Sequence, residues 1–484
     1  MNDEVGFTPF VSLCFTINYV MGTGFLTLPD AFNSAGIALA LVTLTSVAFL
    51  ANISKNFVLE AMARAELLHP ESTTIDELLL EKGSEPNHLP HSPFELLAVK
   101  ERKFEVVELC KFFLGDRGGK AYMTTFGFYM YGCLWAYTAV FGNAMASVLP
   151  LHTSDDYLLY VFLFAVFTVP LTCMELREQV FVQVALSFCR LAMMVLMVST
   201  TVAAFNSTTP QFGVVGAGTQ TSHYEPTRWF DLSGFYKILP VAVYANIYHH
   251  SIPGLSMPVA DKSKLHLIFL CVFAVMMVGY GLIGVSVAYY FGDNVQGMSN
   301  LNWHDYLANS GFCSKNCEPD ESTNADKNSI KEWTDRASYV LWIVWFVVLF
   351  PALDVASAFP LNGITLGNNL MSSWHGENTR IAEGDRRKVT AFRIIAAVPP
   401  IVGACFVREL SKITDYTGML GFAICFIFPA LLNLRSKERC KREGLKSDTI
   451  YQCFWSGNDV WSLGMVWFGV GLFVYVFYSL LSNE

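Results

Sequence analysis

A glycine–threonine–glycine sequence at Gly22, Thr23 and Gly24 interrupts a stretch without charged residues that runs from Phe7 to Pro29. A helix of that length can cross a bilayer, since about 20 apolar residues suffice. Two glycines weaken its hydrogen bonding near mid-membrane depth, and freed backbone groups are tolerated there only where they are buried in protein or line a polar cavity. Free N–H groups at a helix start bind carboxylates well. We therefore predict a binding site for an anionic group at this break.

A second interruption lies in the apolar residues 236–258 and is richer in polar side chains. Backbone carbonyls freed near Ala245 to Tyr248 can accept hydrogen bonds from a cationic group of a ligand, as the first break can bind an anionic group. Paired interruptions in two halves of a membrane protein are typical of the central site of a secondary transporter. The polar side chains at this interruption are Tyr244, Asn246, Tyr248, His249 and His250.

Titratable groups suggest how such a site is coupled to an ion. Histidine titrates near physiological pH, so His249 or His250 can couple transport to a proton, or the two can simply cap freed carbonyls. Asp354 is a carboxylate within the apolar residues 337–361. Because a carboxylate is costly inside a membrane, we expect Asp354 to carry a proton, to pair with a cation, or to stay neutral and bond to the backbone.

The composition is that of a polytopic membrane protein. Of the 484 residues, 53% are hydrophobic and 15% are charged, and the mean hydropathy is +0.39. The net charge of −9 argues against a nucleic-acid partner. No phosphate loop, metal cluster or nucleophile motif is present, so neither an enzyme nor a cofactor is predicted. The expected partner is the lipid bilayer.

Apolar runs between charged and turn residues predict an all-α protein with eleven transmembrane helices. The expected spans are residues 7–34, 36–62, 121–147, 157–174, 180–204, 236–258, 265–290, 337–361, 389–407, 413–434 and 460–481. The two interruptions fall in spans 1 and 6. Because this offset of five spans is odd, the second half is inverted relative to the first. Residues 7–204 and 236–434 are thus expected to form a 5+5 inverted repeat with broken helices 1 and 6.

Loop composition predicts the orientation. Lysine and arginine gather in the loops after spans 2, 4, 6, 8 and 10, which places the N-terminus in the cytoplasm and the C-terminus outside or in a lumen. Asn206, in the outer loop 205–235, begins a glycosylation sequon. Cys313 and Cys317, in the outer loop 292–336, either form a disulfide or remain free thiols. Arg190 is expected to anchor at the inner interface or to pair with a glutamate of the preceding loop.

Two of the expected cytoplasmic loops follow spans 2 and 10. Residues 63–120 contain four prolines in their first half, and Phe94 to Leu114 have the mixed apolar and charged spacing of an amphipathic helix. We expect a mobile loop followed by that helix, with a possible protein partner at residues 70–115. The other cytoplasmic loop comprises residues 435–459, and residues 460–484 form span 11 and an outer tail.

Several motifs carry a resemblance to a known family. They are Asn18-x-x-x-Gly22-Thr23-Gly24 with Leu28-Pro29, Glu105-x-x-Glu108-Leu109-Cys110-Lys111, Phe359-Pro360, and Gly418-x-x-Gly421 with Phe428-Pro429-Ala430. The chain resembles the amino acid/auxin permease family of the amino acid–polyamine–organocation superfamily. His250-Ser251-x-Pro253 and Leu349-Phe350-Pro351 further resemble the transmembrane protein 104 group.

The resemblance implies a leucine-transporter-type fold and amino acid transport driven by sodium or protons, with a small amino acid as the expected substrate partner. It implies that Asn18 is an ion ligand, with Ser357 as a hydroxyl partner, and that Tyr137 covers the substrate. Asp354 stands where the family usually has a hydroxyl, so it can complete an oxygen cage for sodium or act in proton coupling. An alternative is a transporter-like amino acid sensor with a cytoplasmic partner and little flux.

Overall fold

The computed structural model describes residues 7–68, 97–99, 104–174, 180–205, 226–306, 327–375 and 385–483. Over these residues the regular elements are helices, with two isolated bridges between Phe7 and Val259 and between Leu97 and Thr449. Eight of the helices are long and apolar enough to cross a membrane. The prediction of an all-α membrane protein is therefore confirmed.

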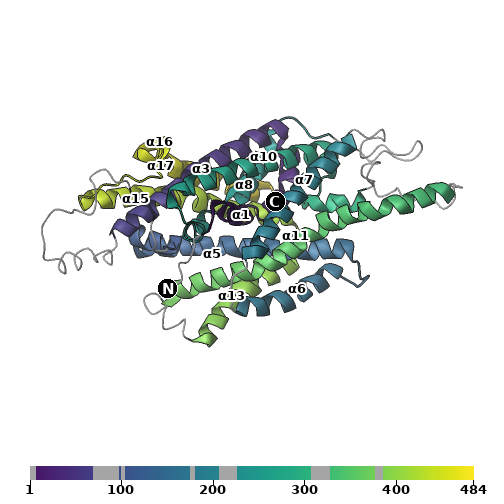
Figure 1. Ribbon diagram of the computed structural model, residues 1–484, viewed down its shortest axis with the longest axis horizontal. Helices are drawn as coiled ribbons and strands as arrows, with labels where there is room; N and C mark the ends of the chain where they lie inside the picture. Colours follow the sequence, from purple (N-terminus) through teal and green to yellow (C-terminus); the bar gives the residue numbers. More distant parts are fainter. Residues whose placement is uncertain are drawn as a thin grey trace.

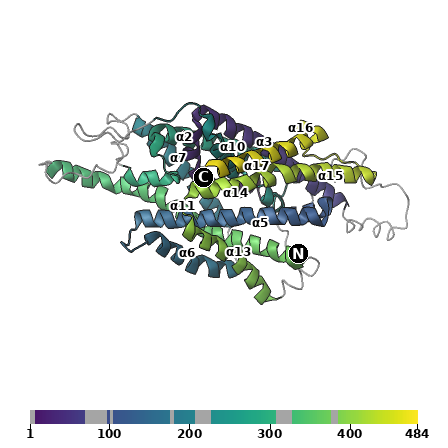
Figure 2. The ribbon, with the colours of Figure 1, turned by 180° about the vertical axis from the view of Figure 1, so that it is seen from behind.

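Seven predicted spans correspond to continuous helices and one to a helix with a kink. These are α3 (Ile37–Leu68), the kinked α5 (Val106–Val148), α6 (Asp156–Cys173), α7 (Val180–Phe205), α10 (Leu265–Phe291), α11 (Lys327–His375), α13 (Arg386–Phe406) and α17 (Asp459–Asn483). Helices α6 and α13 lie on one side of α5. Helices α3, α10, α17 and α15 (Phe428–Arg442) lie on the other side (Figure 1, Figure 2).

Three predicted spans are divided. Span 1 consists of α1 (Pro9–Val20), a short 3-10 helix (Thr23–Leu26) and α2 (Leu28–Ala35). Span 6 consists of α8 (Phe235–Asn246), a 3-10 turn (His249–Ser251) and α9 (Ile252–Ser256). The predicted breaks in spans 1 and 6 are thus confirmed. In span 10 a π-helical turn at Ala423–Ile427 joins α14 (Leu410–Phe422) to α15 (Phe428–Arg442), a feature that the sequence pattern did not indicate.

The predicted amphipathic helix from Phe94 to Leu114 is wrong at its start, whereas its end agrees with a kink at Gly115. Leu97 is not helical and instead exchanges backbone hydrogen bonds with Asp448 and Ile450. Helix α5 begins at Val106, where a capping box between Glu105 and Glu108 satisfies the first amides. It then runs through a kink at Gly115, whose φ of 76° lies in the left-handed region that glycine adopts readily. The expected surface helix is therefore the first turns of α5.

Two other boundaries differ for a similar reason. Helix α15 continues to Arg442, so the predicted loop 435–459 starts as helix. Ion pairs one turn apart, such as Arg435 with Glu438 at 2.7 Å, support this polar end. Helix α11 begins at Lys327, ahead of the apolar residues that predicted it. Hydropathy locates the membrane-embedded part of a helix and not its polar extensions.

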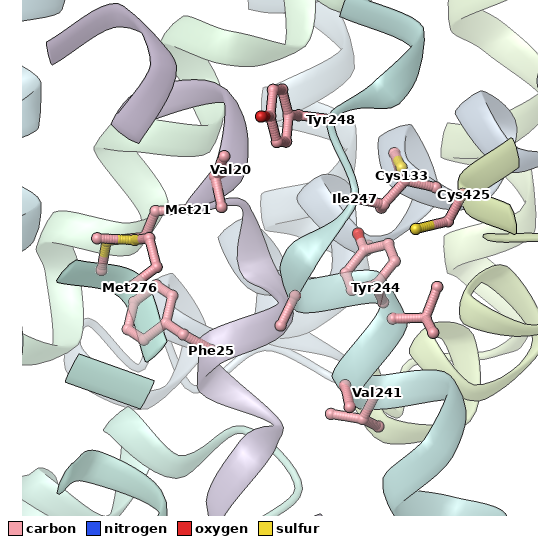
Figure 3. Packing of buried hydrophobic residues seen from close by; sticks show 14 of the residues in the cluster. Val20, Met21, Phe25, Cys133, Val241, Tyr244, Ile247, Tyr248, Met276 and Cys425 are labelled. Atoms are coloured by element: carbon pink, nitrogen blue, oxygen red, sulfur yellow. The ribbon is translucent and has the colours of Figure 1, made fainter. Parts of the chain in front are cut away.

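The two broken segments lie side by side in the core of the molecule (Figure 3). Gly24 approaches α8 so closely that a Cβ atom there would lie 2.8 Å from Tyr244 Cδ1 and 3.1 Å from the Cα of Ala245. The hydroxyls of Thr23 and Tyr244 are 3.1 Å apart and share a hydrogen bond. The breaks therefore face each other, as the inverted repeat requires.

Candidate functional site

A cavity of about 270 Å³ lies between the two breaks. Helices α1, α5, α7, α8 and α11 each contribute residues to its wall. Six of the side chains or backbone positions predicted from the sequence line it, namely Asn18, Gly22, Tyr137, Tyr244, His250 and Ser357. The structure thus brings together residues that are spread over almost the whole chain.

Local backbone geometry explains the space at the first break. Helix α1 ends at Val20, and Met21 and Gly22 leave helical geometry before the chain resumes as a 3-10 helix at Thr23. A Cβ atom at Gly22 would have nothing within 4 Å. Gly22 therefore opens the backbone to the cavity, whereas Gly24 serves close packing against α8.

The remaining predicted residues of the substrate site lie outside the cavity wall. Asn246 is buried and donates through Nδ2 to the carbonyl of Ala242 at 2.8 Å. Tyr248 is fully buried, with its ring centroid 5.5 Å from those of Phe269 and Phe273. Thr23 and Gly24 form the contact between the breaks described above. These four residues shape the site from behind.

The two histidines of the second break differ in their surroundings. The Nε2 atom of His249 is 2.8 Å from Ser54 Oγ and 3.1 Å from the carbonyl of Ala51, so His249 fastens the break to α3. His250 faces the cavity, and its ring lies between those of Phe126 and Tyr129, at centroid distances of 5.5 and 5.6 Å. Of the two, His250 is the one placed to meet a ligand.

Asp354 has a charged partner that the sequence analysis assigned elsewhere. Arg190 of α7 donates to both carboxylate oxygens of Asp354, through Nε at 3.1 and 3.0 Å and through Nη2 at 2.8 Å. The expectation that Arg190 anchors at the interface or pairs with a nearby glutamate is therefore wrong. The two residues are separated by 164 positions, so local sequence gives no sign of the pair.

The same guanidinium binds the end of α1. Its Nη1 atom donates to the backbone carbonyls of Asn18 and Met21, the latter at 2.8 Å. These are carbonyls that the helix end leaves without helical partners. Ser357 uses its hydroxyl to donate to the carbonyl of Asp354 at 2.8 Å. The oxygen atoms between α1 and α11 are therefore organised around a guanidinium.

Aromatic side chains make up much of the rest of the wall. Tyr129 and Tyr137 of α5 line the cavity, and Asn362 of α11 donates to the Tyr137 hydroxyl at 3.3 Å. Tyr129, Asn362 and Arg190 were not predicted from the sequence as residues of the substrate or ion site. Arg190 was the easiest to find, because an arginine within an apolar span calls for a partner inside the protein.

The central cavity has a neighbouring cavity toward one face of the molecule. A second cavity of about 290 Å³ shares part of its wall with the first, including Met130, His250 and Asn362. It extends to Phe7 and Glu105, at the end where α1 and α5 begin, which we call the N-terminal face. Toward the opposite face, the contacts of Gly24 and Thr23 with α8 lie between the central cavity and the surface.

Some expectations concern residues outside those described. They are the sequon at Asn206, the cysteines Cys313 and Cys317, and most of the partner segment 70–115. Over the described part of the chain, no group of three or more His, Cys, Asp or Glu side chains is arranged to hold a metal ion.

Comparison with known proteins places the chain in a family. Along most of its length it is similar to Transmembrane protein 104 homolog of Dictyostelium discoideum (24% identity, covering 90% of each chain) and Transmembrane protein 104 of Mus musculus (24% identity, covering 88% and 87%). A crystal structure of the Eremococcus coleocola manganese transporter gives a TM-score of 0.49 at 12% identity, covering 98% of this chain and 95% of the other. The family model described as "Transmembrane amino acid transporter protein" matches residues 7–309. The chain therefore belongs to the transmembrane amino acid transporter family.

Proposed function

We propose that this protein is a secondary active transporter that carries amino acids with neutral side chains across a membrane by alternating access. The observation that carries the proposal is the central cavity at the paired helix breaks, which shares part of its wall with a second cavity toward one face. The contacts of Thr23 and Gly24 with α8 lie toward the other face. A binding site reached from one side at a time is the arrangement that alternating access requires.

The backbone at the breaks suits the two charges of an amino acid. At the first break Gly22 lines the cavity, and nothing lies within 4 Å of its Cβ position, so a carboxylate would approach the backbone there. The last carbonyls of α8, before the break at Ile247, lack helical partners and would accept from the ammonium.

The cavity wall favours a neutral side chain. Its aromatic residues include Tyr129, Tyr137 and Tyr244, and its one charged side chain, Arg190, is already paired with Asp354. A ligand with a further charge would be desolvated without a partner of opposite sign, which is costly. The volume of about 270 Å³ suits a small ligand.

The coupling ion that we propose is the proton. Sodium prefers a cage of oxygen ligands, but the carbonyls of Asn18 and Met21 and the carboxylate of Asp354 already surround the Arg190 guanidinium. His250 faces the cavity and offers an imidazole, a group that can bind and release a proton.

We further propose that the N-terminal face is cytoplasmic. The basic end of α15, with Arg435, Arg439 and Arg442, lies on the same face as Glu105, since Arg439 donates to the carbonyl of Phe112 at 2.9 Å. Cytoplasmic ends of membrane helices are enriched in such residues. The protein would then expose its binding site to the cytoplasm in this conformation.

An uptake screen tests the proposal. The purified chain is reconstituted in liposomes, and labelled amino acids of neutral, acidic and basic type are supplied with an imposed pH gradient. We expect accumulation of at least one neutral amino acid above the level of protein-free liposomes. Binding without accumulation for every amino acid would contradict transport and favour the alternative of a sensor.

A further inference from the structure

A third cavity, also of about 270 Å³, lies toward the face opposite the N-terminal face. It is enclosed by α2, the first turns of α8 and α14, and the end of α17. Asp30, Lys237 and Asp415 line it, one from each of the first three helices. None of them belongs to the central site described above.

Over the described residues the three charged groups form no hydrogen bond and no close ion pair, although the Lys237 ammonium interacts electrostatically with both carboxylates. Asp415 is only 8% exposed, yet the structure gives its carboxylate no hydrogen bond and no ion pair. The same holds for Asp30 and for the Lys237 ammonium, both of which are half-buried. A buried carboxylate without a partner is strongly unfavourable, so its presence calls for a ligand that supplies the missing charge.

The rim of this cavity is neutral. Glu409 and Lys412 also line it, but they are exposed and pair with each other at 2.9 Å. The interior then carries two carboxylates and one ammonium. A zwitterionic amino acid matches this set, because its ammonium can bind between the carboxylates of Asp30 and Asp415 while its carboxylate binds Lys237.

The third cavity lies in line with the central one. Tyr244 lines the central cavity and Val241 lines the third. The two residues are three positions apart on α8, which corresponds to a rise of about 4.5 Å along the helix. On the other segment, Gly22 lines the central cavity and Thr27 the third. The contacts of Thr23 and Gly24 with α8 form the layer between them. A ligand released across this layer enters the third cavity directly.

We propose that this cavity is a second amino acid site, which holds the substrate at the face opposite the N-terminal face before or after it occupies the central site. Asp30 and Asp415 bind the ammonium and Lys237 binds the carboxylate. The inference rests on the proposed function for the nature of the ligand, although its residues are separate.

The test uses binding to full-length protein in which the central site is blocked. Gly22→Leu places a side chain into the central cavity, because Gly22 is part of its wall and nothing lies within 4 Å of its Cβ position. Labelled L-alanine and L-leucine are the probes. We expect residual binding of at least one probe in Gly22→Leu, and a loss of about tenfold or more in that affinity on adding Asp415→Asn, as befits a charge-assisted hydrogen bond. We expect Lys237→Met, added to Gly22→Leu, to lower the affinity for the probe by a similar factor.

A matched control lies on the same face. Asp231 pairs with Arg228 at 2.6 Å, outside the cavity, so Asp231→Asn leaves the residual binding unchanged. Asp415→Asn without ligand also keeps or raises the thermal unfolding midpoint, because it removes an unpaired buried charge. A lowered midpoint would show instead that Asp415 is a structural ion-pair partner, and would overturn the proposal.

The two proposals fail in different ways. Absence of residual binding in Gly22→Leu, or residual binding that Asp415→Asn leaves intact, overturns the second site while uptake by the unmodified protein still supports transport. Absence of uptake by the unmodified protein overturns transport, whereas residual binding that depends on Asp415 still supports the second site.

Discussion

The carboxylate of Asp354 accepts three hydrogen bonds from the Arg190 guanidinium, the shortest of them 2.8 Å long, and both side chains are almost fully buried. Through the carbonyls of Asn18 and Met21 the guanidinium also holds the end of α1. It thus ties α1, α7 and α11 together beside the central cavity.

Removing one partner of this pair should destabilise the protein strongly. Arg190→Met leaves the Asp354 carboxylate buried without a countercharge, and we expect a loss of about 3–5 kcal/mol in the free energy of unfolding. The double variant Arg190→Met/Asp354→Leu should lose less than the sum of the two single variants, because neither charge remains. Thermal unfolding of the four proteins in detergent measures the difference. Strict additivity would show that the two residues do not interact.

Ion dependence tests the role of the guanidinium. If it takes the place of sodium, replacing sodium by potassium at constant pH leaves uptake unchanged, whereas an imposed pH gradient raises it. In His250→Gln the glutamine side chain takes the place of the imidazole but has no titratable group. This variant should still exchange internal for external substrate, and its uptake should no longer respond to the pH gradient. Uptake that required sodium would contradict this assignment.

A second buried ion pair, on α3, is hydrogen-bonded to α15, and we expect it to hold these two helices together. Glu60 and Arg64 are fully buried and 2.5 Å apart, and Arg64 Nη1 also donates to Asn433 Oδ1 at 2.7 Å. Arg64→Met should cost about 3–5 kcal/mol of stability because Glu60 keeps its charge. The control is Arg442→Met, which removes an exposed pair with Glu438 and should leave the unfolding midpoint nearly unchanged. Equal effects of the two variants would refute the structural role of Arg64.

The two glycines of the first break should respond differently to one added carbon. Gly24→Ala places a Cβ against Tyr244 and Ala245, and such overpacking costs about 1–3 kcal/mol. It should also hinder the approach of the breaks and lower the uptake rate. Gly22→Ala meets no atom within 4 Å and should retain stability. Unfolding midpoints and initial uptake rates check both statements, and identical behaviour of the two variants would contradict the geometry.

Sequence periodicity and composition were sufficient for the membrane class and for the breaks in spans 1 and 6. Charge-free runs report burial in lipid directly, and glycine and proline report where a helix is weakened. The first cavity then contains Asn18, Gly22 and Tyr244, all assigned from the sequence. The position of a break is a local property, which is why it was predictable.

Long-range pairing was not predictable in this way. Asp354 attracted attention as a carboxylate in an apolar helix, but its partner Arg190 is on another helix, and many partners satisfy the same local pattern. The roles of Gly22 and Gly24 were also indistinguishable in sequence. Only the packing of α8 against the second glycine separates the residue that opens the cavity from the residue that closes it.

The most direct test of the central claim is the exchange of labelled for unlabelled neutral amino acid by Gly22→Leu and Gly22→Ala in liposomes, with equal amounts of folded protein. The leucine side chain occupies more of the cavity beside the first break than the alanine side chain does. We predict that exchange falls to the level of protein-free liposomes in Gly22→Leu and stays within about twofold of the unmodified protein in Gly22→Ala. Exchange that persists in Gly22→Leu would show that the amino acid does not pass through this cavity.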